Sequence, residues 1–438
     1  MSSHMASDFE GGELVFCGAT DWSMVGRVPT KKKTDKEKQA EADRLAKYPP
    51  LTAPHRIKSL CGVKIKIVAS SPTSCHTLAV SSSGQVYAWG RNEKGQLGLG
   101  DFQNRNAPTV VDGIDNVIGA ATGRNHSVVV VSKGDSYAWG LNASGQLGIG
   151  ALKPVKKGQD EETHLVPTKC AVAGATQAAC GADFTLWICD GKVLSCGSSQ
   201  YGQLGHGTDG EYNSADSSIK IEYVKEPTPQ AISGFGGAKV LKVACGNNHS
   251  AALAEDGSAW TWGFGGYGRL GHKEQKDEWA PRKLEVFTGR QVIPLDQPAH
   301  VACGAAMTAF TGIAGQLYLH GKVKQTGDSV MYPKPYMELS GWQIRSMAIG
   351  NTTTAVAAET SCITFGTAIN GELGYGPNGP KSSANPKKVN ALEDMTTHLV
   401  ACGAGHTVFV IDPTGPRFEK LPTYDAPEDE SPAAKEKG

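Results

Sequence analysis

The chain has 438 residues, of which 39% are hydrophobic and 20% charged, and its 43 basic and 43 acidic side chains leave no formal net charge. This balance excludes bulk electrostatic attraction to nucleic acid or to an anionic membrane, so any nucleic-acid contact needs a local patch. No apolar run reaches the roughly 18 residues of a membrane span, so we expect a soluble, intracellular protein. The 54 glycines favour tight turns over long helices, so we expect short secondary-structure elements.

The first segments of the chain are expected to lie mostly outside the core. Residues 1–12 begin with Met-Ser-Ser-His-Met-Ala-Ser, which resembles a vector-derived scar, and are predicted to be disordered. The apolar run Glu13–Gly18 predicts a strand. Residues 27–58 form a charged loop insertion with Lys31-Lys32-Lys33 and a Lys/Glu/Ala stretch through Ala46. The simpler interpretation of this insertion is a solvated linker or a short exposed helix. The functional alternative is a patch that directs nuclear import or contacts phosphate groups.

A first repeated pattern marks pairs of strands along the chain. It begins with an apolar run, which is followed by a small residue or a Cys-Gly pair. A polar residue or a His-Ser/Thr pair comes next and begins a second apolar run. Seven copies begin at Ile67, Ile118, Ala179, Ala244, Ala302, Ala348 and Ala401. Apolar runs between Gly- and Asn-rich turns, such as Ser127–Val131, indicate β-strands.

A second repeated pattern is an aromatic or equivalent residue followed by glycine, usually with Gly-Gln-Leu-Gly five residues later. Its glycines are Gly18, Gly90, Gly140, Gly197, Gly263, Gly321 and Gly366. Glycine permits positive φ angles and close backbone approach at turns, so we predict a structural role for these seven residues. A phosphate-binding loop would need Gly-Lys-Ser/Thr at the start of a helix, and the sequence has none.

The two patterns are out of step at the ends of the chain, and this predicts the architecture. The copy at Gly18 has no first pattern before it, and the copy at Ala401–Thr407 has no second pattern after it. Joining these two copies in one blade completes a ring of seven and removes exposed sheet edges. We therefore predict an all-β fold, a single seven-bladed β-propeller over residues 13–412 in which the N- and C-terminal strands share one blade. The Pro-, Glu-, Asp- and Lys-rich residues 413–438 are predicted to be a disordered tail.

Histidine and cysteine recur at fixed positions of the repeat without forming a metal motif. His76, His126, His249 and His406 are equivalent, but other repeats place Phe184, Met307 and Thr353 there, which favours packing or hydrogen bonding over metal ligation. The eleven cysteines are an odd number and include no Cys-x-x-Cys motif, so we expect buried free thiols. No nucleophile with a matching base is found. We predict no catalytic residue, no metal and no cofactor, and hence a protein that is not an enzyme.

Three loops stand out from the regular repeat. Residues 151–167 carry Lys153, Lys156, Lys157, Asp160, Glu161 and Glu162, and residues 206–230 lengthen one blade. Such insertions carry function on many rigid scaffolds, although they also arise by drift. The third loop combines charged and aromatic side chains, and Trp and Arg are common interface anchors. We predict a partner-binding surface there, made of Tyr267, Arg269, His272, Lys276, Trp279 and Arg282.

With both patterns in place, the repeat resembles that of the regulator of chromosome condensation family over residues 13–412. Phe16–Thr20, Trp89–Gly98, the run from Trp262 through Glu278, and Gly341–Ser346 are most similar to the branch of the telophase-disc protein, the second human member. In this family the founding member exchanges nucleotide on Ran while docked on nucleosomes, and the telophase-disc branch is linked to Rac- and Ral-type GTPases and to microtubules.

The resemblance implies a non-enzymatic interaction scaffold of cell division. Its expected partners are a small Ras-superfamily GTPase of the Rac, Ral, Arf or Ran type and, through local patches, chromatin or microtubules. It is expected to be a monomer, nuclear and chromosome-associated with a cytoplasmic or cytoskeletal pool. Guanine-nucleotide exchange without bond chemistry is the first interpretation, and a passive adaptor that sequesters the GTPase is the alternative.

A different function within the same fold is that of the plant UV-B photoreceptor, which stacks tryptophans from a repeated Gly-Trp-Arg-His-Thr motif at a dimer face. Only Gly341–Arg345 approaches that motif here, and Trp89, Trp139 and Trp262 belong to the second repeated pattern instead.

Overall fold

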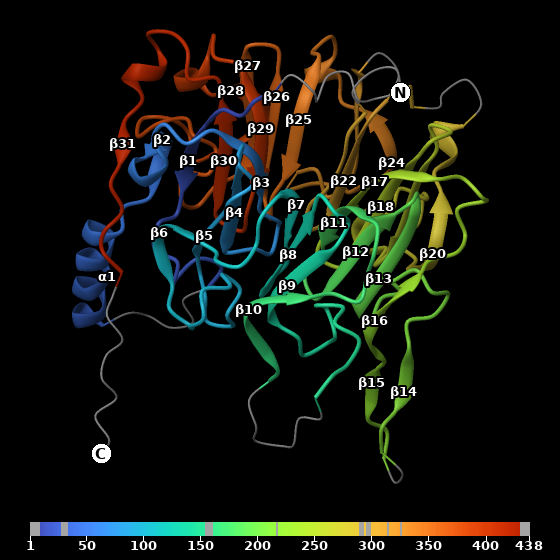
Figure 1. Cartoon of the computed structure of the whole chain (residues 1–438). Helices are drawn as coiled ribbons and strands as arrows, with labels where there is room; N and C mark the ends of the chain where they lie inside the picture. The colour runs from blue at the N-terminus through green and yellow to red at the C-terminus, as the bar shows by residue number, and fades with distance from the viewer. Residues whose placement is uncertain are drawn as a thin grey trace, which may run out of the picture.

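The computed structural model describes residues 9–27, 34–153, 161–215, 218–288, 293–294, 299–312, 315–324 and 326–429. Within these residues, six four-stranded antiparallel sheets and one five-stranded sheet surround a central channel, and a separate two-stranded hairpin projects from them (Figure 1). The predicted seven-bladed β-propeller is confirmed. In the same residues no helix has the length and hydropathy that a membrane crossing requires.

Each blade has an inner, a second, a third and an outer strand. The inner strands supply the walls of the channel, and in blades 1 to 7 they are β3 (Ile65–Ala69), β7 (Val117–Thr122), β11 (Ala175–Cys180), β17 (Val240–Cys245), β21 (Val301–Cys303), β25 (Ile344–Ile349) and β29 (Thr397–Cys402). The second strands are buried almost throughout, which explains their continuous apolar sequence. They are β4 (His76–Ser81), β8 (His126–Val131), β12 (Phe184–Cys189), β18 (His249–Ala254), β22 (Met307–Thr311), β26 (Thr353–Ala358) and β30 (His406–Ile411).

The third strands end at or next to the glycines of the second repeated pattern. They are β5 (Val86–Gly90), β9 (Ser136–Leu141), β13 (Lys192–Ser198), β19 (Ala259–Gly263), β23 (Leu317–Gly321), β27 (Ser361–Thr367) and, in blade 7, β1 (Glu13–Gly18). Gly90 shows why glycine is needed, since its φ is 112° and a Cβ atom there would lie 2.6 Å from the Cys75 carbonyl oxygen. We call the end of the propeller where the third strands finish the turn face.

The outer strands share a feature that the sequence analysis did not use: every one contains proline. They are β6 (Arg105–Val110), β10 (Thr163–Lys169), β16 (Lys225–Ala231), β20 (Glu278–Lys283), β24 (Val330–Pro335), β28 (Ser382–Lys388) and β2 (Leu51–Ile57). Proline has no N–H for a further strand to pair with, so its presence protects the outer edges of blades 1 to 6 against edge-to-edge association. In blade 7 the strand β2 is itself covered by the short strand β31 (Thr423–Tyr424).

Blade 7 closes the ring as predicted. β1 pairs antiparallel with β30, from Glu13 opposite Ile411 to Gly18 opposite His406. β2 then pairs with β1 and forms the outer strand of this blade. The ring is therefore joined by hydrogen bonds between the two ends of the chain.

The boundaries of the charged insertion and of the tail differ from the prediction. Residues 27–58 contain an exposed helix, α1 (Asp35–Lys47), but Leu51–Ile57 is strand β2 and belongs to the blade. Disorder is wrong for residues 9–12, since Phe9 stacks on His398 and Gly12 pairs with Ile65. Lys31–Lys33 and residues 1–8 lie outside the described residues. Disorder is also wrong for residues 413–429, since Phe418 and Leu421 are buried and β31 (Thr423–Tyr424) pairs with β2. Residues 430–438 lie outside the described part.

Candidate partner-binding surface

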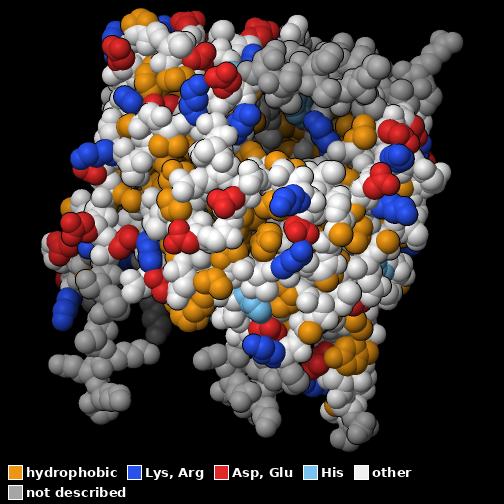
Figure 2. Space-filling model, viewed as in Figure 1, with side chains coloured by type: hydrophobic (Ala, Val, Ile, Leu, Met, Phe, Trp, Pro, Cys, Tyr) orange, Lys and Arg blue, Asp and Glu red, His pale blue; other side chains and the backbone are white. Residues whose placement is uncertain are grey.

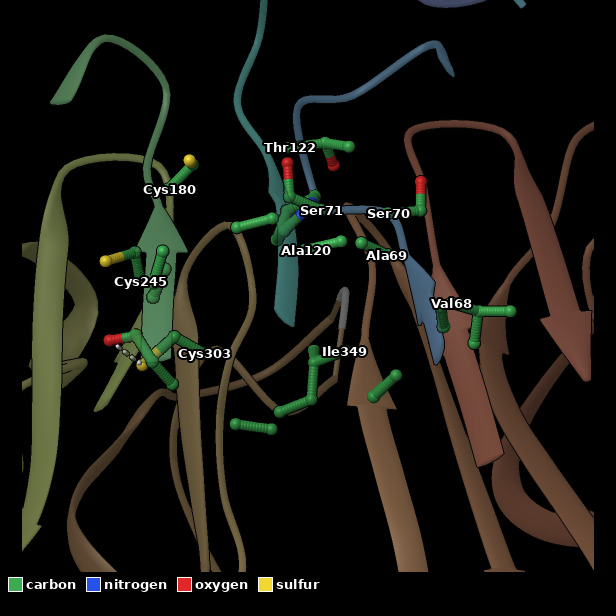
Figure 3. A pocket seen from close by; sticks show the side chains of 18 of the residues that line it. Val68, Ala69, Ser70, Ser71, Ala120, Thr122, Cys180, Cys245, Cys303 and Ile349 are labelled. Atoms are coloured by element: carbon green, nitrogen blue, oxygen red, sulfur yellow. Dashed lines mark hydrogen bonds between the residues drawn. The ribbon is translucent and has the colours of Figure 1, made fainter. Parts of the chain in front are cut away.

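The central channel has walls of small side chains and encloses about 300 Å³. Cys180, Cys245 and Cys303 lie on one side of it (Figure 3). Burial raises the pKa of the Cys303 thiol to about 12 and raises the pKa values of the Cys180 and Cys245 thiols as well. These thiols are therefore protonated at neutral pH and are poor nucleophiles. Among the described residues, no group of three or more His, Cys, Asp or Glu side chains is arranged to hold a metal ion.

The equivalent histidines connect neighbouring blades. His126 Nε2 lies 3.0 Å from Thr185 Oγ1 in the next blade, and this hydroxyl donates to the Gln146 carbonyl oxygen at 2.7 Å. The imidazole Nε2–H is therefore the donor to the hydroxyl. The other three histidines make the same kind of contact, in the pairs His76–Ser127, His249–Thr308 and His406–Thr77. The predicted hydrogen-bonding role is confirmed, and the last pair joins blade 7 to blade 1.

The Gly-Gln-Leu-Gly segments are structural turns. In blades 1 to 3 the glutamine side chain accepts a hydrogen bond from the backbone N–H two residues earlier, as Gln96 Oε1 does from Lys94 at 2.8 Å. The glutamine carbonyl oxygen accepts from the next blade, including the Trp139 Nε1–H at 2.8 Å. Trp262 makes the corresponding bond to Gln203. These tryptophans are buried, so they are not placed for the stacked surface that the photoreceptor interpretation requires.

Blade 4 has a rebuilt version of this turn because arginine replaces glutamine. Arg269 cannot accept a hydrogen bond, and instead its Nε donates to the Gly266 carbonyl oxygen at 2.8 Å and its Nη1 to that of Ala305 at 2.7 Å. The Tyr267 N–H donates to Gln275 Oε1 at 3.0 Å. Tyr267 adopts φ 60°, whereas its equivalents Lys94 and Tyr201 keep negative φ. The exchange of an acceptor for a donor accompanies this change of backbone conformation, and the Tyr267 side chain is 48% exposed.

The six predicted partner-binding residues divide into two groups. Tyr267, Lys276 and Trp279 are exposed. Arg269 is only 4% exposed, and Arg282 is ion-paired at 2.6 Å to both Glu274 and Glu278. The His272 Nε2–H donates to Thr261 Oγ1 at 2.9 Å, because that hydroxyl itself donates to the Leu270 carbonyl oxygen. Burial lowers the pKa of His272 to about 4. The structure therefore leaves the first group free for a partner and assigns structural contacts to the second.

The loop of residues 206–230 holds a feature that the sequence analysis missed. β14 (Glu211–Asn213) and β15 (Ile221–Tyr223) form a hairpin that extends from the turn face beyond the blades (Figure 1). Its apolar side chains face solvent, and Ile219 is 86% exposed. The remaining residues from Lys225 onward are the outer strand β16. The alternation of Ile219, Ile221 and Tyr223 was the available signal for a strand.

The prediction of a loop over residues 151–167 is wrong from Thr163 onward, where strand β10 begins. The acidic residues just before this strand contact the protein itself. Glu161 is ion-paired with Lys94 at 2.8 Å, and Glu162 contacts His164 at 3.0 Å. Lys153 N–H donates to the Glu162 carboxylate. Lys156, Lys157 and Asp160 lie outside the described residues.

Comparisons with known proteins agree with this geometry. The family model described as "Regulator of chromosome condensation (RCC1) repeat" matches residues 83–130, 133–188, 190–253, 256–311 and 361–410. Human "Protein RCC2" is 35% identical over 94% of this chain and 79% of its own length. The "Ultraviolet-B receptor UVR8" of Arabidopsis thaliana is 30% identical over 79% of this chain and 75% of its own.

The solved structures with this architecture include Prp20p from Saccharomyces cerevisiae, described with its binding properties to Gsp1p and histones. It superposes with a TM-score of 0.70 and 20% sequence identity, over 95% of this chain and 97% of Prp20p. At this identity the likeness concerns the fold.

Proposed function

Because the chain belongs to the regulator of chromosome condensation (RCC1) repeat family, we propose that it is a non-enzymatic scaffold that binds a small Ras-superfamily GTPase through its turn face. Two lines support the choice of partner: the resemblance to the telophase-disc branch of the family, and the description of Prp20p with binding to Gsp1p. Fold alone does not fix function, so the proposal depends on the surface that this chain presents.

The observation that carries the proposal is the β14–β15 hairpin. Figure 2 shows hydrophobic side chains gathered at the lower right, over the projecting hairpin. Tyr212, Ile219, Ile221 and Val224 are all exposed there. A two-stranded hairpin is only marginally stable alone in water, and clustered exposed apolar side chains mark interaction sites. A partner that covers the hairpin stabilises it.

Nucleotide exchange by such a surface needs differential binding and no bond chemistry. A partner surface that binds the nucleotide-free GTPase more tightly than the loaded form accelerates nucleotide release. A thousandfold preference corresponds to about 4 kcal/mol. Burying one large apolar side chain contributes about 1.5–3 kcal/mol. Tyr212, Ile221 and Val224 are already about half buried, so complete burial of all four hairpin side chains against the nucleotide-free form alone supplies about 3–6 kcal/mol, which covers the required difference.

The passive adaptor is the second candidate, because the same exposed side chains would also hold a GTPase without favouring its empty form. The two candidates separate in a release assay with fluorescently labelled GDP on Ran, Rac, Ral and Arf-type GTPases. Acceleration of release supports exchange. Binding without acceleration leaves the adaptor, and no binding to any of the four contradicts the proposal.

A matched pair of variants ties the activity to the hairpin. Replacing Ile219 and Ile221 by serine removes its apolar contacts, whereas Ile369→Ser changes an equally exposed isoleucine, 84% exposed, in the blade 6 loop of the same face. We expect Ile219→Ser/Ile221→Ser to lower GTPase affinity at least tenfold and Ile369→Ser to leave it within about twofold.

Chromatin or microtubule contacts, and with them a nuclear, chromosome-associated location with a cytoskeletal pool, are the second part of the proposal. They are supported by the family resemblance and by the description of Prp20p with histones. Co-sedimentation of the purified chain with nucleosomes and with microtubules tests them separately, and failure with both would remove this part while leaving GTPase binding untouched.

A further inference from the structure

Aromatic rings and cations alternate across the turn face of blades 3 to 5. The rings of Tyr201 and Phe264 have centroids 4.9 Å apart. Arg269 Cζ lies 4.5 Å from the Phe264 centroid and 5.6 Å from that of Tyr267. Lys322 Nζ lies 5.2 Å from the Tyr267 centroid. We call these five residues the aromatic–cation ladder, and they come from the loops that follow β13, β19 and β23.

The ladder contains two cations that share no ion pair with a carboxylate in the described part of the chain. The Arg269 guanidinium is bonded only to carbonyl oxygens. Asp277 adds a smaller electrostatic influence, but its Oδ1 accepts from the Gly265 N–H at 2.8 Å. Burial lowers the pKa of Arg269 to about 10, so the group stays charged at neutral pH. A desolvated cation without a counter-ion is unfavourable, and a nearby anion lowers that cost. Because Arg269 is only 4% exposed, it acts on a ligand through its charge and by holding Tyr267 in place, and the Tyr267 ring and Lys322 are left to contact the ligand.

The backbone at the outer end of the ladder is strained. Tyr267 has φ 60° and ψ 15°, a left-handed conformation that a bulky aromatic residue seldom adopts. A residue keeps such a strained conformation only where several surrounding contacts hold it in place, and strained residues are concentrated at ligand-binding sites. Here the constraint comes from Arg269 and Gln275, and its result is an exposed ring beside Lys322.

The surroundings extend the same chemistry. Trp279, 45% exposed, packs over Gly202, next to Tyr201 at the inner end of the ladder. On β24, Tyr332 is exposed and Lys334 Nζ lies 5.1 Å from its ring. Exposed aromatic side chains combined with cations are typical of protein interfaces.

We propose that the aromatic–cation ladder is a docking site for an acidic peptide segment of a protein partner. Charge complementarity selects an acidic segment, and the rings offer apolar contact between the carboxylates. The ladder offers only two unpaired cations, so it suits a segment with a few spaced carboxylates better than a polyphosphate with closely spaced charges. Glu274 and Glu278 in the same loop are ion-paired with Arg282, and Asp277 accepts from the Gly265 N–H. The site goes beyond GTPase binding, and it does not require the hairpin.

Fluorescence anisotropy with two labelled probes tests the proposal directly. The probes are a 12-residue peptide that alternates Glu and Asp with Gly and Ser, and a single-stranded DNA oligonucleotide of 12 nucleotides. We expect the peptide to bind, to weaken as salt is raised from 50 to 300 mM, and to bind more tightly than the DNA. No peptide binding, or tighter DNA binding, overturns the proposal.

Three variants locate the peptide on the ladder. Arg269→Gln restores the turn of blades 1 to 3, and we expect at least tenfold weaker peptide binding with an unchanged or higher melting temperature. Lys322→Gln should weaken binding about threefold, while Lys133→Gln, a charge-matched change in the β8–β9 loop on the opposite face, should not. If Arg269→Gln fails to fold, Tyr267→Gly decides, because glycine accepts φ 60° and removes only the ring. If peptide binding is undiminished in Lys322→Gln and in Arg269→Gln, or in Tyr267→Gly where Arg269→Gln does not fold, the ladder is not the binding site.

Discussion

The histidines between blades predict an acid-sensitive fold, and His126 allows the effect to be isolated. Burial lowers the pKa of His126 to about 3 from an ordinary value of about 6.5. Because the folded state has the lower pKa, the unfolded chain binds the proton first as the pH falls. Stability is therefore unaffected above about pH 6.5 and declines from there toward pH 3. At pH 5 the difference of about 1.5 units corresponds to ~2 kcal/mol for this one side chain.

Replacing His126 by phenylalanine removes the titration while preserving the packing. Phe184 occupies the equivalent position in blade 3, and a glycine lies against the ring in both blades, Gly123 and Gly181. The variant loses the hydrogen bond to Thr185, which costs about 1 kcal/mol at pH 7.5. At pH 5 it no longer loses the ~2 kcal/mol, so it becomes more stable than the wild-type chain by about 1 kcal/mol.

Equilibrium urea unfolding at pH 7.5 and pH 5, followed by tryptophan fluorescence, measures this crossover. The reciprocal variant Phe184→His should steepen the loss of stability with acid. If His126→Phe and the wild-type chain lose equal stability between the two pH values, the neutral, buried state assigned to His126 is wrong.

Three other predictions follow from the packing of the blades. In a urea titration, Gly90→Ala should lower the free energy of unfolding by about 2–3 kcal/mol, because the new Cβ atom would lie 2.6 Å from the Cys75 carbonyl oxygen. The control is Gly119→Ala, whose Cβ atom would have no neighbour closer than 3.6 Å, and it should change the free energy of unfolding little. Phe418→Ala should cost about 3 kcal/mol and loosen β31 from β2, measured as faster amide hydrogen exchange at Thr423–Tyr424; unchanged exchange would show that this aromatic side chain does not anchor the tail. Cys61 is the exposed thiol and Cys189 is half-buried, whereas the other nine cysteines are buried. Cys61 should account for the fast phase of labelling by a thiol reagent, so a fast phase that persists in the double variant Cys61→Ser/Cys189→Ser would contradict the burial of the others.

The fold could be predicted from the sequence because every blade has the same packing, with glycines and buried strands at equivalent positions, and the same residue types therefore recur along the chain. Gly18 and Ala401–Thr407 were sufficient to predict the shared blade that the pairing of β1 with β30 confirms. Leu51–Ile57 was missed because an outer strand faces solvent and contains Pro54, which lowers its apolar signal. The ordered tail was missed because Phe418 and Leu421 anchor it without any periodicity.

The candidate surface was harder to predict, because burial and pairing decide which charged side chains are free. Arg269 and Tyr267 are separated by one residue, yet the first is buried and the second exposed. In the sequence, the one signal is that Arg269, a hydrogen-bond donor, stands where the repeats of blades 1 to 3 have glutamine, an acceptor. The effect of this replacement on the turn can be stated only once the hydrogen bonds of the glutamine-containing turns are known. Lys322 joins this surface from another blade, a contact that spacing along the chain does not reveal.

The central claim is that the turn face is where this scaffold binds a small GTPase. Hydrogen–deuterium exchange of the chain, with and without an excess of each nucleotide-free GTPase of the four types, tests it most directly. We expect at least one GTPase to protect residues 208–215 and 218–224 of the hairpin loop, while the opposite-face loops at 111–116 and 132–135 exchange as before. Protection confined to the opposite face, or no protection by any of the four, would contradict the account.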